Sequence, residues 1–301
     1  MERHVQGEVG RALLLALTGF SILSLGDAVV KTMAGEWPGS AVSALRYNFG
    51  ALGLAVAVGL RHGRKGFVFP RPWLQFGRGA AVSLATICFF LGVMAMPLAD
   101  ATAIQFTSPI LTALLSGIVL GERVPKVALM ATLLAFAGVL IVLRPNLIEL
   151  GAEAFYPIGA AFGMAWLIML NRKSAGDAPV LVMQFLLALM AAPLLLVSAA
   201  ALVLTGLPQF AVPVPSAEVV LKCAFVALTA SSGHLLIYAA TVRANAAAVA
   251  PMTYVQLLIA ALLGWWWFGD APDLVSLAGA ALIIAGGLWL WRAQKRAHAG
   301  A

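Results

Sequence analysis

Hydrophobic positions in this chain form long runs, and short polar segments separate them. Most runs extend over about 18 to 24 residues, which is enough for a helix to cross a hydrocarbon core of roughly 30 Å. Glycine, proline and charged residues mark where the runs end. The pattern predicts ten membrane-spanning helices at residues 11–31, 40–60, 74–96, 99–120, 125–143, 154–171, 179–204, 217–240, 245–268 and 273–292.

The composition agrees with an all-α membrane protein. Of the 301 residues, 62% are hydrophobic and only 10% are charged, whereas a soluble domain has about a quarter of its residues charged. The net charge of +7 comes from short segments between apolar runs. We therefore expect the lipid bilayer as the surrounding medium and expect no nucleic-acid partner.

Lysine and arginine are distributed unevenly between the two sides of the predicted bundle. If the N-terminus is cytoplasmic, most of the 19 basic residues fall on the cytoplasmic side, Arg78 among them as part of the segment between the second and third helices. The other side then holds only Lys31, Arg144 and Lys222. Basic residues accumulate in cytoplasmic loops, so the sequence predicts that both termini lie in the cytoplasm.

The chain also contains an internal repeat at a fixed offset. Residues 99–144 recur as residues 247–292, which lie 148 positions later, without a gap. The same offset aligns the turn Gly121-Glu122 with Gly269-Asp270. A duplicated half in a hydrophobic chain is typical of carriers whose site lies between two related halves.

Each half holds five helices, and five is an odd number. The second half must therefore enter the membrane from the side opposite to the first. The sequence predicts two inverted five-helix repeats, at residues 11–144 and 154–292, related by a pseudo-two-fold axis in the membrane plane.

Short motifs in the two halves are similar to those of a known family. They lie at residues 107–110, 120–123 and 137–140, and again at residues 251–256, 267–270 and 285–288. With their order, the ten helices and Arg46 in the second helix, they resemble the EamA-type members of the drug/metabolite transporter (DMT) superfamily. The second copy has Gln256-Leu257 where the first has Ser108-Pro109, so the halves are not expected to contribute equally.

This resemblance implies a secondary transporter that moves small organic metabolites across the inner membrane by alternating access. The similar bacterial exporters, among them those of aromatic amino acids, indicate amino acids as the solute, in export or exchange. An importer of a nucleoside-like or sulfonium metabolite is the alternative within transport. A passive pore or a membrane-embedded enzyme is the alternative of another class. The protein would act as a monomer or a homodimer.

Charge within a membrane-spanning helix is costly and marks candidate functional sites, and three charged residues qualify clearly. Asp27 and Lys31 are one helical turn apart on the first helix, so they can pair along one face. Arg46 lies about two turns into the second helix, and Asp27 is its expected partner. All three are candidates for gating or an ion pair, and for Asp27 and Lys31 a structural ion pair at the membrane interface is the alternative.

Polar residues follow one face of two predicted helices at spacings of three to four residues, and a third predicted helix carries polar residues shortly after Pro251. The candidates for substrate binding are Gln105, Ser108 and Thr112, then His234 and Tyr238, and finally Tyr254 and Gln256. Pro109 frees the carbonyl of Gln105 for a ligand or water. The three stripes predict a polar internal cavity, and hydrogen bonding between helices is the alternative.

Trp166 is a further candidate, because an aromatic ring in the middle of the sixth helix can stack on a flat or apolar solute. Ordinary packing is the alternative. Cys88 and Cys223 lie in apolar runs and are expected to pack as small hydrophobic residues. The sequence has no phosphate-binding loop, no catalytic constellation and no cluster with metal-ligand spacing. We therefore expect no enzyme activity, metal or cofactor, and no primary pump.

Overall fold

The computed structural model describes residues 2–33, 35–95, 102, 104–121, 124–143, 152–268 and 273–299. Over these residues it is all-helical and contains no strand. The helices of the first half are α1 (Glu2–Lys31), α2 (Gly39–His62), α3 (Pro72–Ala95), α5 (Ser108–Leu120) and α6 (Lys126–Leu143). Those of the second half are α7 (Phe155–Lys173), α8 (Val180–Leu204), α9 (Ala217–Arg243), α10 (Ala246–Val249), α11 (Val255–Phe268) and α12 (Leu274–Ala299).

Each of the ten predicted ranges contains helix in the described residues. Within the part of the chain that the structure describes, five helical segments are long and apolar enough to cross a membrane, and they belong to α1, α2, α3, α8 and α9. Shorter apolar segments lie in α5, α6 and α12. Both α1 and α12 extend beyond the predicted apolar runs, toward the chain termini.

The predicted continuous helix over residues 245–268 is wrong. The structure divides it into α10, a 3-10 turn at Ala250–Tyr254 and α11. Pro251 lies in that turn, and a proline has no N–H to continue an α-helical hydrogen-bond ladder. The first half has a similar break, since a turn at Phe106 and Thr107 precedes α5. Residues 99–101 of that predicted helix lie outside the described residues.

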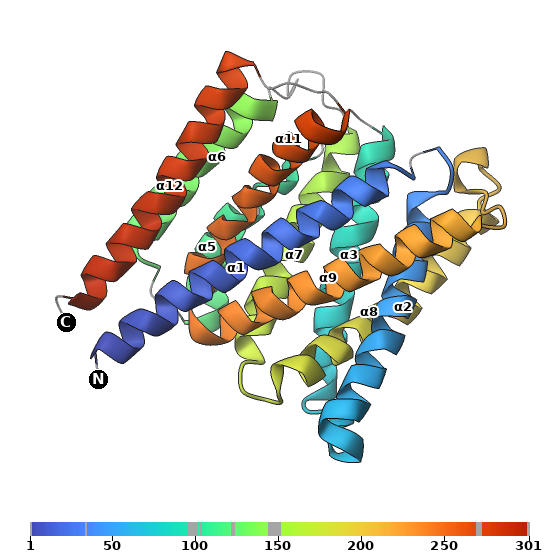
Figure 1. Ribbon diagram of the computed structural model, residues 1–301, viewed down its shortest axis with the longest axis horizontal. Helices are drawn as coiled ribbons and strands as arrows, with labels where there is room; N and C mark the ends of the chain where they lie inside the picture. Colours follow the sequence, from blue (N-terminus) through green and yellow to red (C-terminus); the bar gives the residue numbers. More distant parts are fainter. Residues whose placement is uncertain are drawn as a thin grey trace.

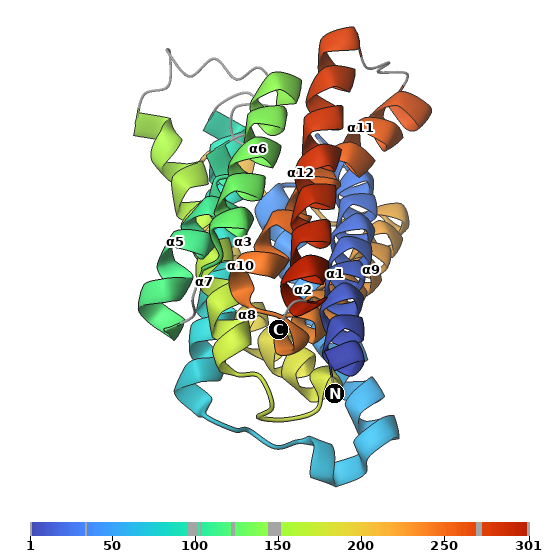
Figure 2. The ribbon, with the colours of Figure 1, turned by 90° about the vertical axis from the view of Figure 1, so that its left-hand side faces the viewer.

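Helices from opposite halves of the chain lie side by side. The main pairs are α1 with α9, α3 with α7, α2 with α8, and α6 with α12. Figure 1 shows α1 running along α9 and α6 running along α12. In Figure 2 the same α6–α12 pair faces the viewer, in front of the other helices. No half forms a separate body, because each main pair joins one helix from either half.

Two of these pairs touch through their backbones. A Cβ placed on Gly19 of α1 would lie 2.8 Å from the carbonyl oxygen of Gly233 on α9, and the reverse distance is also 2.8 Å. In the α3–α7 pair, a Cβ on Gly163 would lie 2.8 Å from the carbonyl oxygen of Ala81. Small residues allow this close approach of membrane helices, which van der Waals contact then holds together.

The α6–α12 pair is built in the same way at two levels. A Cβ on Gly138 would lie 2.5 Å from the carbonyl oxygen of Gly279, and a Cβ on Gly286 would lie 2.9 Å from that of Ala131. The two contacts are equivalent in the repeat. Gly138 and Gly286 are 148 positions apart, and so are Ala131 and Gly279, so each contact becomes the other when the two halves are exchanged.

Candidate functional site

Asp27 of α1 is exposed on a helix face that is otherwise buried. Phe20 and Ser24 lie on the same face, two turns and one turn before it, respectively, and their exposed fractions are 0% and 2%. Gly26, the residue directly before Asp27, packs against Thr229 of α9. A face that packs on neighbouring helices does not turn to lipid, so the exposed Asp27 carboxylate indicates an opening within the bundle.

Arg46 of α2 and His234 of α9 lie near this carboxylate. The Arg46 guanidinium acts electrostatically on both Asp27 and His234. The two helices approach closely here, since a Cβ on Gly50 would lie 3.0 Å from the Ser231 hydroxyl. Both Arg46 and His234 are half-buried.

The structure shows no direct ion pair between the described side chains of Arg46 and Asp27, although we expected one. The Arg46 charge acts on the Asp27 carboxylate only as a longer-range electrostatic interaction. The guanidinium lies over the ring of Tyr47, 5.1 Å from its centroid, and its Nε atom has no hydrogen-bond partner among the described residues. The side chain of Lys31 lies outside the described part of the structure. Arg46 therefore presents a buried N–H that a bound anion can satisfy.

Gln256 lies at the start of α11, where α1 contacts the broken helix. The Ser24 hydroxyl donates a hydrogen bond of 2.8 Å to the Gln256 carbonyl oxygen, and the Thr253 hydroxyl donates to its Oε1 atom at 2.9 Å. Tyr254 is buried, its ring meets Phe106 edge-on with centroids 6.0 Å apart, and its hydroxyl has no partner among the described residues. Phe106 and Tyr254 are equivalent positions of the repeat.

Part of the polar stripe before and within α5 forms hydrogen bonds inside the helix. Thr112 is fully buried and donates its hydroxyl to the Ser108 carbonyl oxygen at 2.9 Å. Ser108 is also buried, whereas Gln105 is half-buried at the turn before α5. Of these three candidates, Gln105 has the side chain that is most available to a solute.

We expect Ser24→Ala to destabilise the protein by about 1 kcal/mol, because it removes a buried hydrogen bond between two helices. Thermal unfolding in detergent measures the change as a lower melting temperature. Ser21→Ala is the matched control, since the Ser21 hydroxyl donates at 2.8 Å to Leu17 of its own helix. Equal melting temperatures for the two variants would contradict a stabilising α1–α11 hydrogen bond.

Trp166 of α7 is half-buried and stacks on Phe162, with ring centroids 5.8 Å apart and an interplanar angle of 14°. It packs against the core cluster that includes Tyr47 of α2. Tyr47 is the residue that follows Arg46, so the cluster that Trp166 packs against includes α2, the helix that carries Arg46.

Tyr238 lies apart from these residues, at the end of the bundle where α3 begins and α7 ends. Its hydroxyl donates a hydrogen bond of 2.8 Å to the Ser174 carbonyl oxygen. The Arg78 guanidinium lies over its ring, 4.9 Å from the centroid. Along α9, Tyr238 therefore contacts Arg78 directly, whereas both Arg46 and Arg78 act electrostatically on His234.

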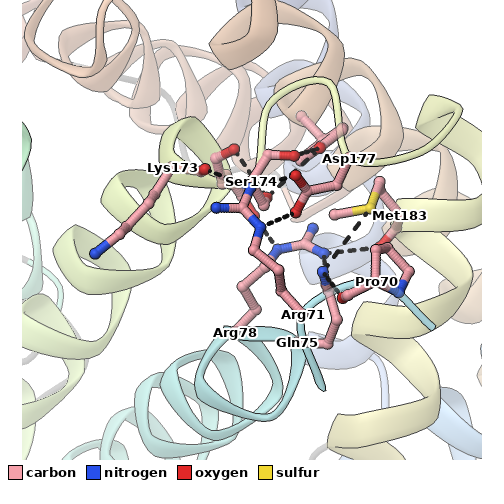
Figure 3. Close-up of polar contacts among 10 residues, drawn as sticks. Pro70, Arg71, Gln75, Arg78, Lys173, Ser174, Asp177 and Met183 are labelled. Atoms are coloured by element: carbon pink, nitrogen blue, oxygen red, sulfur yellow. Dashed lines mark hydrogen bonds and ion pairs between the residues drawn. The ribbon is translucent and has the colours of Figure 1, made fainter. Parts of the chain in front are cut away.

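Arg78 is the functional candidate that the sequence interpretation missed. That interpretation assigned it to a basic cytoplasmic segment, but the structure places it within α3 with an exposed fraction of 0%. The available signal was its position in the second turn of an apolar helix, three residues after Gln75. Figure 3 shows Arg78 and Gln75 among the polar side chains at this end of the bundle.

Arg71 forms an ion pair with Asp177 just outside the membrane-spanning part of α3. The Arg71 Nε atom donates to Asp177 Oδ2 at 2.7 Å, and Nη2 donates to the other carboxylate oxygen and to the Lys173 carbonyl oxygen (Figure 3). The hydrogen-bonded carboxylate raises the pKa of Arg71. This bidentate pair fixes the start of α3 to the loop between α7 and α8.

Comparisons with known proteins agree on one family. The model of the EamA-like transporter family matches residues 10–144 and 152–292. The chain is 25% identical over 287 residues to an S-adenosylmethionine uptake transporter of Rickettsia bellii, covering 93% of this chain and 94% of that protein. It is 26% identical to the pseudopaline exporter CntI of Pseudomonas aeruginosa, covering 94% and 96%. It is 28% identical to a riboflavin transporter of Rhizobium johnstonii, covering 94% and 91%.

A solved crystal structure has the same fold. Its chain is 21% identical to this one and superimposes with a TM-score of 0.76, covering 93% of this chain and 96% of the other.

Proposed function

The chain belongs to the EamA-like transporter family, and from this premise we propose that it carries a small metabolite with an amino-acid head group by alternating access. The family and the named relatives make it a multi-pass inner-membrane transporter of small metabolites. The amino-acid head group, the inverted arrangement of the halves and the site residues are the proposal.

Reciprocal contacts support two inverted repeats with their axis in the membrane plane. The Gly138–Gly279 and Ala131–Gly286 contacts exchange under a shift of 148 positions. A comparable exchange relates Gly19 against Gly233 to Gly163 against Ala85, with shifts of 144 positions from Gly19 to Gly163 and 148 from Ala85 to Gly233. The Ala85 backbone nitrogen would lie 2.7 Å from a Cβ on Gly163. A two-fold axis produces such exchanged pairs. Together with the positive-inside pattern, this arrangement supports a cytoplasmic location for both termini.

The observation that carries the proposed substrate is the pair of opposite charges at the opening. Arg46 offers an N–H without a partner to a carboxylate, and Asp27 offers an exposed carboxylate to an ammonium group. The absence of a direct ion pair between them leaves both free to bind a zwitterion. An α-amino acid head group carries both charges on one carbon, so it satisfies the two residues together.

The remaining candidates fit the body of the solute. Gln105 and Gln256 are half-buried at the two helix breaks and can exchange hydrogen bonds with polar atoms. Trp166 and Phe162 form an aromatic surface that can stack on a flat group. His234 lies beside Arg46, where the neutral imidazole can accept or donate one hydrogen bond.

A sulfonium metabolite is the second candidate substrate. The Rickettsia bellii relative is named for uptake of S-adenosylmethionine, a molecule that combines an amino-acid head, a sulfonium cation and a flat base. The exposed Asp27 carboxylate and the Trp166–Phe162 stack suit the cation and the base. Both candidates use the same head-group site, so they differ in what the rest of the cavity accepts.

Counterflow into proteoliposomes tests the proposal. The panel consists of amino acids and S-adenosylmethionine, and we expect saturable counterflow for some of these solutes. We expect no counterflow for the matching amines that lack the carboxylate. Flux that rises linearly with concentration would indicate a pore. Counterflow of riboflavin without any amino-acid signal would replace the proposed substrate class.

A further inference from the structure

We propose that Arg78, Asn171 and Tyr238 form the cytoplasmic gate of the transport pathway, closed in this structure, and that Arg78 is its positioning residue. The assignment of this end to the cytoplasm rests on the proposed orientation. The gate itself rests on contacts between helices, and these can be tested without a substrate.

The Arg78 guanidinium joins four helices. Its Nε atom donates to Asn171 Oδ1 on α7 at 2.8 Å, and its Nη1 atom donates to Gln75 Oε1 on α3 at 2.7 Å. Nη1 also donates to the Met183 carbonyl oxygen on α8 at 3.0 Å (Figure 3). The contact to α9 is the stack on Tyr238. The three hydrogen bonds are directional and the stack on α9 is not, so α9 can leave the cluster most readily.

Two further contacts join the α3–α7 pair to α9 at this end. The Tyr238 hydroxyl donates to the Ser174 carbonyl oxygen that follows α7. The Arg172 Nη1 atom donates to the Thr241 and Val242 carbonyl oxygens near the end of α9, each at 3.1 Å. Hydrogen bonds and a cation–π contact therefore seal the seam between α3–α7 and α1–α9 here.

A fully buried arginine such as Arg78 is an unusual means of stabilising a helix bundle. Among the described residues no carboxylate contacts it, because Asp177 pairs with Arg71, and its Nη2 atom has no hydrogen-bond partner. Burial of a cation without a direct counter-ion is costly, and an apolar side chain would fill this space at lower cost. A cluster of polar contacts can instead be broken and remade during a cycle, and this explains the choice of arginine.

The opposite end of the bundle lacks the same cluster. Aligning α1 with α7 through Gly19 and Gly163 places Asp27 at the position of Asn171. Aligning α3 with α9 through Ala85 and Gly233 places Val226 at the position of Arg78 and Phe90 at that of Tyr238. Asp27 is exposed where Asn171 is buried. One end is thus closed by an arginine, and its counterpart has none and is open.

This difference defines the state of the molecule as open to the outside and closed to the cytoplasm. Opening to the cytoplasm requires α9 to draw Tyr238 away from Arg78 and from the Ser174 carbonyl oxygen. His234 is one turn before Tyr238 on α9, near Arg46, so a solute bound at Arg46 lies against the helix that must move.

Labelling of a reporter cysteine tests the gate. The native thiols are first removed (Cys88→Ala, Cys223→Ala), and Ser174→Cys then places a thiol at a position with an exposed fraction of 0%. A membrane-impermeant maleimide applied to inside-out vesicles reaches this thiol only when the gate opens. Tyr238→Phe removes the hydroxyl but keeps the ring, and we expect it to raise the labelling rate about fivefold, as loss of one buried hydrogen bond does.

Asn171→Asp gives the opposite result, because a carboxylate beside Arg78 strengthens the closed state. We expect labelling and maximal transport to fall about fivefold or more, with no rise in the half-saturating concentration outside. Thr132→Val is the matched control, because its equally buried hydroxyl donates at 2.7 Å within α6, outside the gate cluster, and labelling should remain at the parent rate.

Unchanged labelling in Tyr238→Phe, or faster labelling in Asn171→Asp, would overturn the gate. If Asn171→Asp fails to fold, the Tyr238→Phe result decides alone. A cluster that only stabilises the fold would change the melting temperature of these variants without moving labelling in opposite directions. Labelling as expected without transport of any panel solute would reject the proposed function and keep the gate.

Discussion

Replacement of Arg46 by alanine is expected to lower transport of carboxylate-bearing solutes about 100-fold at low concentration, and to leave the fold intact. Hydrogen bonds to charged groups contribute about 1.5–3 kcal/mol each, and a carboxylate held by two of them loses at least 3 kcal/mol, which is a factor of about 100. The guanidinium is half-buried with an N–H lacking a partner among the described residues. Removing such a group relieves a desolvation cost, so the melting temperature should not fall.

Two variants separate charge from geometry at this site. Arg46→Lys keeps the positive charge but loses the planar fork, so an intermediate loss of about tenfold is expected. Arg61→Gln is the control on the same helix, because Arg61 is exposed near the end of α2, and its transport should match that of the parent. Initial uptake rates in proteoliposomes measure all three. Wild-type transport by Arg46→Ala would reject the proposed carboxylate site.

The hydrophobic pattern predicted the helices well, because runs of apolar residues follow directly from the thickness of the membrane. It failed where a helix is interrupted without leaving the apolar run. The break at Ala250–Tyr254 occurs among apolar residues, and Pro251 was its only local signal. Pro193 shows why that signal is ambiguous, since it lies inside the continuous helix α8.

The charged residues show a similar limit. The cost of burying charge singled out Asp27 and Arg46, and the structure places both where α1, α2 and α9 meet. The same principle did not find Arg78, because its distance from the start of α3 suggested an interfacial residue. Its burial comes from Asn171 and Met183 on helices far away in sequence, and one helix considered alone does not contain that information.

Gly233→Leu is expected to prevent correct assembly, with a loss of at least 3 kcal/mol in the free energy of unfolding. The new Cβ would lie 2.8 Å from the Gly19 carbonyl oxygen and from two carbon atoms of Leu23. Backbone cannot yield to this contact, so α1 and α9 must separate along the core cluster that includes Phe20 and Ile237. The fraction of monodisperse protein in size-exclusion chromatography and the melting temperature measure the effect.

Gly233→Ala and Gly53→Leu make the result specific. Alanine raises helix propensity by about 1 kcal/mol over glycine, so a lower melting temperature for Gly233→Ala isolates the steric clash with Gly19. A Cβ on Gly53 of α2 meets open space, and leucine there should be tolerated. Near-normal stability of Gly233→Leu would mean that α1 and α9 can separate, whereas the proposed cycle needs them to move as one unit past α3 and α7. The glycine contact thus connects assembly to transport, because it holds Asp27 and His234 on a single rigid pair.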